Sequence, residues 1–253
     1  MNQHARIMGA LMMREIITRF GREGLGFLWL IGEPLLFCVG VVIMWSIIKP
    51  QYEHGIQVTP FVMTGYMCLL MVRHMISYCL GAISANVGLL YHRQIAPVHI
   101  FAARGMLEFA GLTIAFVAVY SALIFMGLVD LPTDVLLLFS GWFILGYLSF
   151  GIGVFFAALA IEFDIMERLV PVMQYLMIPI TGTFFMLGWF SQSVRDILFW
   201  LPIPHTVEMV RGAVFGEFVA VYYTPFYPIA WGTMLLFAGL VIVARARNRL
   251  DVE

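Results

Sequence analysis

The sequence predicts an all-α polytopic membrane protein with six transmembrane helices, and three observations support this fold class. Long apolar stretches fill most of the 253 residues, and charged residues make up only 11% of the chain. Arginines gather in the segments that alternate spans would place on one side of a membrane. The predicted spans are Phe27–Ile48, Phe61–Ser84, Leu107–Val129, Val135–Ile161, Leu169–Phe190 and Phe226–Ala244.

Each span is long enough to cross a hydrocarbon core of roughly 30 Å as a helix that rises about 1.5 Å per residue. The chain is 62% hydrophobic, and its mean hydropathy is +0.95. Segments 49–60, 130–134 and 162–168 are too short to fold independently, so residues 1–253 are expected to form one transmembrane domain. Cys38, Cys68 and Cys79 fall inside spans without metal-site or disulfide spacing.

Residues 8–22, before the first span, are predicted to form an interfacial helix. Met12, Met13 and Ile16 share one side of a helical wheel, while Arg14, Glu15 and Arg19 lie on the other. Such a helix lies in the plane of the membrane surface. A general membrane anchor is the alternative interpretation. No short apolar core follows the N-terminal arginines, so we expect no cleaved signal peptide.

The arginine distribution predicts the orientation of the chain. Six spans place both termini on one side, with ten arginines, against three basic residues on the other side. The positive-inside rule then puts both termini in the cytoplasm of a bacterial inner-membrane protein. The ten are Arg6, Arg14, Arg19, Arg22, Arg93, Arg104, Arg168, Arg245, Arg247 and Arg249, and the three are Lys49, Arg195 and Arg211.

Two connections are long enough to carry function. The cytoplasmic segment 85–106 is predicted to expose a short helix that docks on a partner, and an ordinary interfacial loop is the alternative. Segment 191–225 contains two amphipathic stretches, Val194–Leu201 and Val207–Phe215, separated by prolines and too short to cross. A re-entrant or interfacial helix pair on the periplasmic side is therefore expected. The candidate docking residues are Leu89, Leu90, Tyr91, His92, Arg93, Ile95 and Pro97.

The only lysine of the chain excludes nucleotide chemistry of the P-loop type. Lys49 follows two isoleucines and precedes Pro50, whereas a P-loop needs Gly-Lys-Ser/Thr after a glycine-rich turn. An intramembrane hydrolase is a remote alternative. Ser149 has Gly151 two residues after it, but Tyr147 stands where a nucleophile elbow has its first glycine. We therefore expect a protein that is not an enzyme and that holds no metal or cofactor.

Three groups of residues follow one another along the chain in a recognisable pattern. They are Arg14-Glu15, Arg19, Leu25-Gly26, Trp29 and Glu33-Pro34; then Asn86, Leu89-Leu90, Ile95 and Pro97; and then Pro202, His205, Glu208 and Arg211-Gly212. The pattern resembles ABC-2 type polysaccharide export permeases over essentially the whole chain. It is most similar to the transmembrane subunits of group 2 capsular polysaccharide exporters. Permeases for O-antigen, teichoic acid, lipids or drugs are the alternatives within this class.

The resemblance implies a homodimer with two separate ATPase subunits, which bind ATP and Mg²⁺. Segment Leu89–Ile95 would couple nucleotide-driven closure to the spans. The cargo would be a lipid-linked polysaccharide. It would pass to a periplasmic co-polymerase-type protein and an outer-membrane polysaccharide channel, with no nucleic acid involved. The resemblance also implies roles for Pro202, His205, Glu208 and Arg211 in the re-entrant segment.

The second span contains the pair with the strongest physical reason to meet cargo. An arginine near the middle of a span costs about 2.5–3.5 kcal/mol on insertion scales, so Arg73 should face protein, water or an anion. Its neighbour His74 points about 100° away on a helix. An ion pair of Arg73 with Glu33 or Glu108 is the alternative. Aromatic residues that could stack on sugars complete the candidate substrate path: Tyr147, Tyr175, Phe184 and Phe185.

Overall fold

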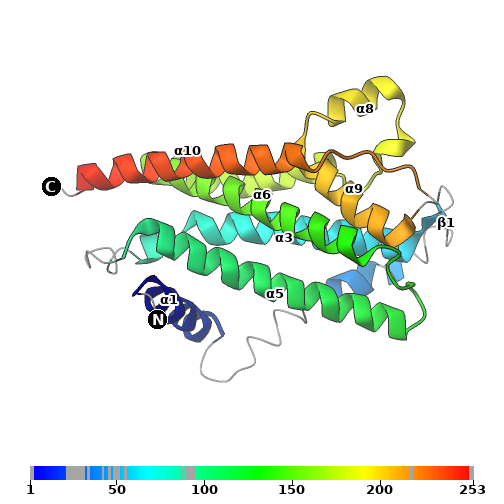
Figure 1. Cartoon of the computed structure of the whole chain (residues 1–253), viewed down its shortest axis with the longest axis horizontal. Helices are drawn as coiled ribbons and strands as arrows, with labels where there is room; N and C mark the ends of the chain where they lie inside the picture. The colour runs from blue at the N-terminus through cyan, green and yellow to red at the C-terminus, as the bar shows by residue number, and fades with distance from the viewer. Residues whose placement is uncertain are drawn as a thin grey trace.

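A computed structural model describes residues 3–20, 32, 35–41, 43–44, 47, 52–53, 56–86, 88, 95–216 and 219–250. Long helices run side by side along one axis, and the two ends of the chain lie at the same end of the bundle (Figure 1). Half of the predicted span Phe27–Ile48 falls outside the described residues. So do Trp29, Glu33, Lys49 and the side chain of Arg19.

Four long helices form the body of the bundle: α3 (Val58–Leu80), α5 (Pro97–Phe125), α6 (Val135–Glu162) and α10 (Phe226–Leu250). Three described segments are long and apolar enough to cross a membrane, namely Pro97–Phe125, Val135–Glu162 and Phe226–Ala246. The mainly helical membrane architecture expected from the sequence is thus confirmed for the described part of the chain. In α3, which is 23 residues long, Arg73 and His74 interrupt the apolar run.

Helix α6 is the central element, packing against α10, α3 and α9 (Pro202–Phe215). Methionines four residues apart on α3, from Met63 to Met75, are fully buried in the main hydrophobic cluster together with Trp142 of α6. Small residues let the backbones approach closely, because a side chain at Gly151 would collide with the main chain of Gly232 on α10. This close packing is typical of helices in membranes, where association depends on van der Waals contact.

The start of α5 corrects the predicted boundaries of segment 85–106. The connection was expected to reach residue 106, but Pro97 is already the first residue of α5, ten residues before the predicted span. Proline suits this position because its missing N–H has no partner in a first turn. Segment 97–106 is therefore helix. Leu89, Leu90, Tyr91, His92 and Arg93 lie outside the described residues.

The predicted fifth span is not a continuous helix. Helix α7 (Ile165–Met177) continues into a 3₁₀ turn, η2 (Ile178–Ile180), and the chain then runs irregularly to η3 (Leu187–Trp189). Pro179 donates no hydrogen bond, and Gly182 has φ 83°, a left-handed conformation that ends the helix. The helical part is about 25 Å long, short of a bilayer core of roughly 30 Å.

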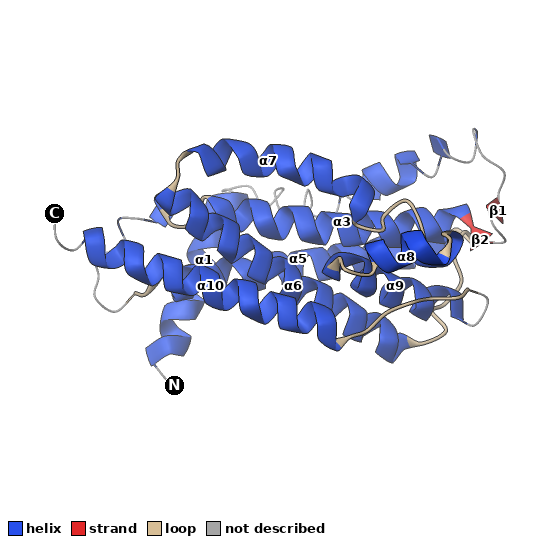
Figure 2. Ribbon diagram, turned by 90° about the horizontal axis from the view of Figure 1, so that it is seen from above, coloured by secondary structure: helices blue, strands red, loops and turns tan. Residues whose placement is uncertain are grey.

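Helix α8 (Gln192–Leu198) and α9 follow as two separate helices, as segment 191–225 predicts. The prolines expected between them instead form the first turn of α9, which begins at Pro202. Figure 2 shows α8 and α9 at the end of the bundle opposite the chain termini, and α7 alongside α3. Strands β1 (Tyr52–Glu53) and β2 (Ile56–Gln57) pair antiparallel at the same end.

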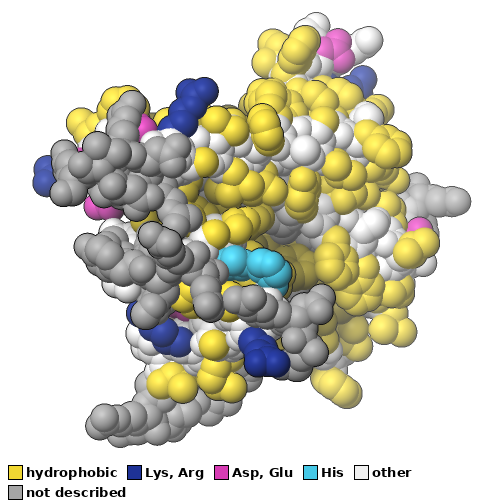
Figure 3. Space-filling view, turned by 60° about the vertical axis from the view of Figure 1, so that its left-hand side comes forward, with side chains coloured by type: hydrophobic (Ala, Val, Ile, Leu, Met, Phe, Trp, Pro, Cys, Tyr) yellow, Lys and Arg dark blue, Asp and Glu magenta, His cyan; other side chains and the backbone are white. Residues whose placement is uncertain are grey.

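Hydrophobic side chains cover much of the visible face of the molecule, and charged side chains gather toward its edges (Figure 3). Many large apolar side chains along the bundle are exposed, including Leu176 at 70% and Phe237 at 70% exposure. A water-soluble protein rarely exposes so much contiguous apolar surface. The lateral surface is therefore suited to lipid.

Candidate functional site

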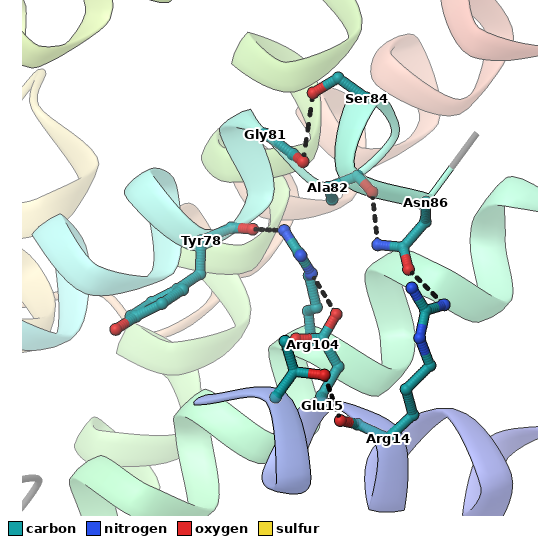
Figure 4. Close-up of polar contacts among 9 residues, drawn as sticks. Arg14, Glu15, Tyr78, Gly81, Ala82, Ser84, Asn86 and Arg104 are labelled. Carbon is teal, nitrogen blue, oxygen red and sulfur yellow. Dashed lines mark hydrogen bonds and ion pairs between the residues drawn. The ribbon is translucent and has the colours of Figure 1, made fainter. Parts of the chain in front are cut away.

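The N-terminal helix α1 (Gln3–Phe20) is tied to the bundle at the end where the chain termini lie. Arg14 Nη1 donates to Asn86 Oδ1 at 2.9 Å, and Asn86 Nδ2 donates to the carbonyl of Ala82 at 2.8 Å. Arg104 Nε on α5 donates to Glu15 Oε1 at 2.7 Å, and its Nη1 donates to the carbonyl of Tyr78 at 3.1 Å. Figure 4 shows these contacts joining α1, the end of α3 and α5.

This polar junction, made of Arg14, Glu15, Asn86 and Arg104, flanks the predicted docking segment. Asn86 ends the 3₁₀ helix η1 (Ser84–Asn86) just before that segment, and Arg104 lies on the first turns of the helix that follows it. The Glu15–Arg104 ion pair is largely shielded, with exposures of 12% and 14%. Sequence reasoning assigned Arg14 and Glu15 to a membrane-surface helix, and it missed their contacts with Asn86 and Arg104.

The exit of the docking segment is also anchored. Ile95 packs against a second hydrophobic cluster, and Pro97 is buried. The Ala96 N–H donates to His99 Nδ1 at 3.0 Å, and His99 Nε2 lies 3.0 Å from His4 Nδ1 on α1. Both ends of the segment are therefore joined to α1 by hydrogen bonds.

Two neighbouring residues of α3 face different helices. His74 Nδ1 lies 3.0 Å from Glu108 Oε1 on α5, and Glu108 is 1% exposed. The Arg73 guanidinium instead lies over the Tyr175 ring of α7, 4.7 Å from its centroid. The predicted alternative of an ion pair between Arg73 and Glu108 was thus wrong, because Glu108 contacts His74 instead. The second suggested partner, Glu33, lies outside the described residues.

Arg73 has no hydrogen bond or ion pair with the described part of the chain, and its Nε is buried. One turn further along α3, Ser77 exchanges hydrogen bonds with Gln174 on α7 at 3.2–3.3 Å. Tyr175 is 60% exposed. The α3–α7 face, made of Arg73, Ser77, Gln174 and Tyr175, therefore presents polar groups on an otherwise apolar bundle.

The other residues of the predicted substrate path do not join the α3–α7 face. Tyr147 Oη lies 2.8 Å from Thr233 Oγ1, in the contact between α6 and α10. Phe184 is 51% exposed in the irregular segment after η2. The Phe185 ring packs against Phe190, with centroids 5.1 Å apart. The structure thus brings together two of the six predicted path residues, Arg73 and Tyr175.

A buried cation supports the irregular segment that follows α7. Arg211 on α9 is fully buried and donates to the carbonyls of Gly182, Thr183 and Phe185. Its guanidinium lies 4.0 Å from the ring centroid of Phe61 on α3. Backbone carbonyls outside a helix need such partners at membrane depth, where water is scarce. Arg211 therefore holds the end of α7 against α3 and α9.

Glu208 lies one turn before Arg211 on α9 and binds main-chain N–H groups, where Arg211 binds carbonyls. Its carboxylate accepts hydrogen bonds from the main-chain N–H of Leu187 at 3.0 Å and of Tyr222 at 3.1 Å. The resemblance pointed to both residues, but sequence reasoning missed that they bind main-chain groups. No periodicity or spacing signal could reveal those distant partners.

His205, in the first turn of α9, is neutral by geometry. Its Nδ1 accepts from the N–H of Thr224 at 3.0 Å, so Nε2 carries the proton and donates to the carbonyl of Phe199 at 2.9 Å. Burial lowers the pKa of His205, and the bond to Phe199 only partly opposes this shift. Both nitrogens of His205 thus fasten the turn between α8 and α9 to the segment before α10.

Comparison with known proteins identifies the family. The chain is 36% identical over 248 residues to the capsule polysaccharide export inner-membrane protein CtrC of Neisseria meningitidis serogroup A, covering 98% of this chain and 94% of the relative. It is 37% identical to BexB of Haemophilus influenzae over the same shares. The polysialic acid transport protein KpsM of Escherichia coli is 30% identical, with coverage of 92% and 90%.

The chain belongs to the family of capsule polysaccharide export inner-membrane proteins. No family model matches it. The relatives align over nearly their whole length, which confirms the resemblance drawn from the sequence motifs. Membership of this capsule export family agrees with a helical bundle that has an apolar lateral surface.

Ser149, the candidate nucleophile of the hydrolase alternative, is bonded within its own helix. The Ser149 hydroxyl is buried and donates to the Leu145 carbonyl at 2.7 Å, which leaves it bonded to the main chain of its own helix. Among the described residues, no group of three or more His, Cys, Asp or Glu side chains could hold a metal ion. In this member of the capsule export family, the polar clusters join helices to one another.

Proposed function

We propose that this chain is the transmembrane subunit of an ABC exporter that moves lipid-linked capsular polysaccharide across the inner membrane. The observation that carries the proposal is the identity of 36–37% over 98% of the chain to capsule polysaccharide export inner-membrane proteins. ATP is bound and hydrolysed, with Mg²⁺, by a separate subunit, because the only lysine lies outside any P-loop pattern.

The chain crosses the membrane six times, with both termini in the cytoplasm. The common location of the termini at one end of the bundle supports an even number of crossings (Figure 1). The arginine distribution supports the orientation. Segment 165–190 is the fifth crossing, completed by non-helical backbone that Arg211 supplies with hydrogen bonds. Helices α8 and α9 then form the re-entrant pair at the periplasmic end.

The polar junction lies on the cytoplasmic side and transmits ATPase movement to the spans. Two ATPase subunits dock on Leu89–Ile95 of two permease copies, and each docking segment pulls on α3 and α5. The ion pair of Glu15 with Arg104 and the bond of Arg14 to Asn86 support this role, because they join α1 to both ends of the segment. A motion of the docking segment therefore moves α1, α3 and α5 together.

Polymer passes along the α3–α7 face, which the two copies of a homodimer enclose. Arg73 supports this path, because its charge has no ion-pair partner in the described part of the chain. Exposed Tyr175 offers an adjacent aromatic face for a sugar ring. A periplasmic co-polymerase-type protein and an outer-membrane channel receive the emerging chain.

Complementation in a capsulated host tests the proposed function. Deleting the permease gene should leave lipid-linked polysaccharide in the cytoplasm and remove it from the cell surface, and the wild-type gene should reverse both changes. The purified chain should bring its ATPase subunit with it and show no ATP hydrolysis alone. Normal surface polysaccharide in the deletion strain, or loss of drug resistance as its only phenotype, would overturn the proposal.

A further inference from the structure

An aromatic cavity lies among α8, the start of α9 and the segment leading into α10. Its volume is about 230 Å³, and none of the predicted substrate-path residues lines it. Its lining combines aromatic rings with one carboxylate. The lining residues are Asp196, Phe199, Trp200, His205, Thr224 and Tyr227.

The walls of this cavity are held in place by hydrogen bonds. His205 binds both the Phe199 carbonyl and the Thr224 N–H, and the Tyr227 hydroxyl donates to the Trp200 carbonyl at 2.7 Å. The Phe199 and Tyr227 rings pack on the His205 ring at centroid distances of 4.2 and 5.1 Å. A site whose walls are fixed in advance loses little conformational entropy when a ligand binds.

The rim of the cavity offers two kinds of contact. Trp200 is 78% exposed, so its indole face is available to a ligand. Asp196 is also exposed, and it has no ion pair within the described residues. A carboxylate accepts hydrogen bonds from two hydroxyl groups, while an aromatic face packs against C–H groups. Sugar rings present both surfaces, hydroxyls at their edge and C–H groups on their faces.

We propose that this cavity binds one uncharged pyranose ring of the exported polymer at the periplasmic end of the permease. The inference rests on the proposed function, which supplies the polymer and the orientation. A typical site for a drug-sized ligand measures roughly 300–1,000 Å³, so the smaller volume here fits one ring rather than a longer segment. Asp196 repels a carboxylated or phosphorylated unit, which selects a neutral or N-acetylated sugar.

A lipid acyl chain is the competing occupant, because exposed aromatic residues also gather at membrane interfaces. Helix α8 favours the sugar. Gln192, Ser193 and Asp196 are exposed on it, and their polar side chains are suited to water, while Ile197 exposes an apolar side chain on the same helix. An acyl chain also has no donor for the Asp196 carboxylate. The cavity is lined mainly by apolar surface, and its Asp196 carboxylate offers a polar contact that a lipid tail would not use.

The test measures glycoside binding to the full-length permease with its ATPase subunit in lipid nanodiscs free of glycoside detergent. Methyl β-D-glucopyranoside and its N-acetylated 2-amino analogue serve as probes in saturation-transfer NMR. At least one probe should bind, and Trp200→Ala should weaken its affinity about tenfold, as expected for loss of an aromatic anchor. Trp200→Phe should retain most of the binding, and Asp196→Asn should weaken it without changing thermal unfolding.

The matched control is Phe163→Ala, which removes an exposed aromatic ring just after α6, at that helix's far end, and should leave binding unchanged. Equal probe binding by wild type and Trp200→Ala, or no binding to wild type, would overturn the cavity assignment. A phospholipid retained by wild type in native mass spectrometry and lost from Trp200→Ala, without glycoside binding, would identify a lipid site. Capsule restoration by the wild-type gene in the deletion strain tests the proposed function separately. The cavity assignment alone fails if export is restored and the glycosides do not bind.

Discussion

His74 and Glu108 join α3 to α5 through a 3.0 Å contact, while the residue next to His74 faces another helix. Glu108 on α5 therefore interacts with His74 and not with Arg73. Among the described residues, the Arg73 guanidinium interacts only with the Tyr175 ring. An arginine at membrane depth is costly unless it serves a function or finds a partner. The division of roles between two adjacent residues makes Arg73 the better candidate to meet an anionic group of the cargo.

Replacing Arg73 should therefore impair transport more than folding. Arg73→Ala should lower the rate of polysaccharide export about tenfold, the loss expected for one charge-assisted hydrogen bond. Arg73→Lys should keep part of the activity, because charge matters more than fork geometry along a polymer path. Export is measured as surface polysaccharide after induction, and thermal unfolding of the purified complex is measured in parallel. Misfolding of Arg73→Ala, rescued by neutralising an acidic residue, would show a structural role instead.

The Glu15–Arg104 contact should couple ATP hydrolysis to export. Glu15→Gln and Arg104→Gln should each reduce export while ATPase activity of the complex persists, because α1 no longer moves with α5. A double-mutant cycle on thermal stability should give an interaction free energy of about 0.5–3 kcal/mol for this shielded pair. Arg6→Gln changes an exposed charge on the same helix and is the matched control. Additive effects of the two substitutions would contradict a direct coupling.

Docking of the ATPase subunit should depend on the predicted segment before α5. Leu90→Asp should abolish export and weaken co-purification of the ATPase, because a carboxylate buried in an interface is costly. The same change at Leu131, an exposed residue in the loop between α5 and α6, should leave both unchanged. Co-purification from detergent extracts checks the prediction. Unchanged subunit association in Leu90→Asp would place the docking surface elsewhere.

Removing the buried cation of α9 should destabilise the protein strongly. Arg211→Met leaves the carbonyls of Gly182, Thr183 and Phe185 without their donor, and should lower the free energy of unfolding by about 3 kcal/mol or more. Arg211→Lys should recover only part, because one ammonium does not reproduce the guanidinium fork. Thermal unfolding measures the loss. Arg195→Gln, on the more accessible α8, is the control and should change stability little.

Sequence reasoning located most helices but not the hydrogen bonds that complete them. The apolar run of α6 and its Asp134 cap, which accepts from the Leu137 N–H, define a helix that matches the predicted span closely. Hydropathy could not show that segment 169–190 leaves the helix at Pro179. That break is stable because Arg211, some 26–29 residues later, binds the freed carbonyls. A contact so distant along the chain leaves no trace in local periodicity.

Sequence reasoning also located only part of the candidate site. Physical cost alone indicated Arg73, because a mid-span charge requires a reason. Aromatic residues carry no comparable signal, since they are common in membrane helices as packing and belt residues. Tyr147 therefore proved to be an α6–α10 contact, while Tyr175 lies beneath the Arg73 guanidinium. Only the fold distinguishes these two tyrosines.

Acidification should loosen the turn between α8 and α9. Burial lowers the pKa of His205 below its ordinary value of 6.5, so the unfolded chain binds more protons in acid and stability falls as pH drops below that value. Protonated Nδ1 would also face the Thr224 N–H, and one of the two bonds would be lost. Thermal unfolding between about pH 8 and pH 5 measures this dependence.

His205→Gln isolates the contribution of His205 from that of the other titratable groups. The variant should be less stable than wild type at neutral pH, because glutamine does not reproduce both ring contacts, yet its stability should depend less on pH. His205 lines the proposed glycoside cavity together with Asp196 and Tyr227, so glycoside affinity in wild type should follow the same pH dependence. Equal pH slopes for wild type and His205→Gln would show that another group controls the acid sensitivity. A smaller dependence of stability on pH in the variant would show that protonation of His205 causes the acid sensitivity. His205 is the imidazole that joins the turn after α8, α9 and the segment before α10.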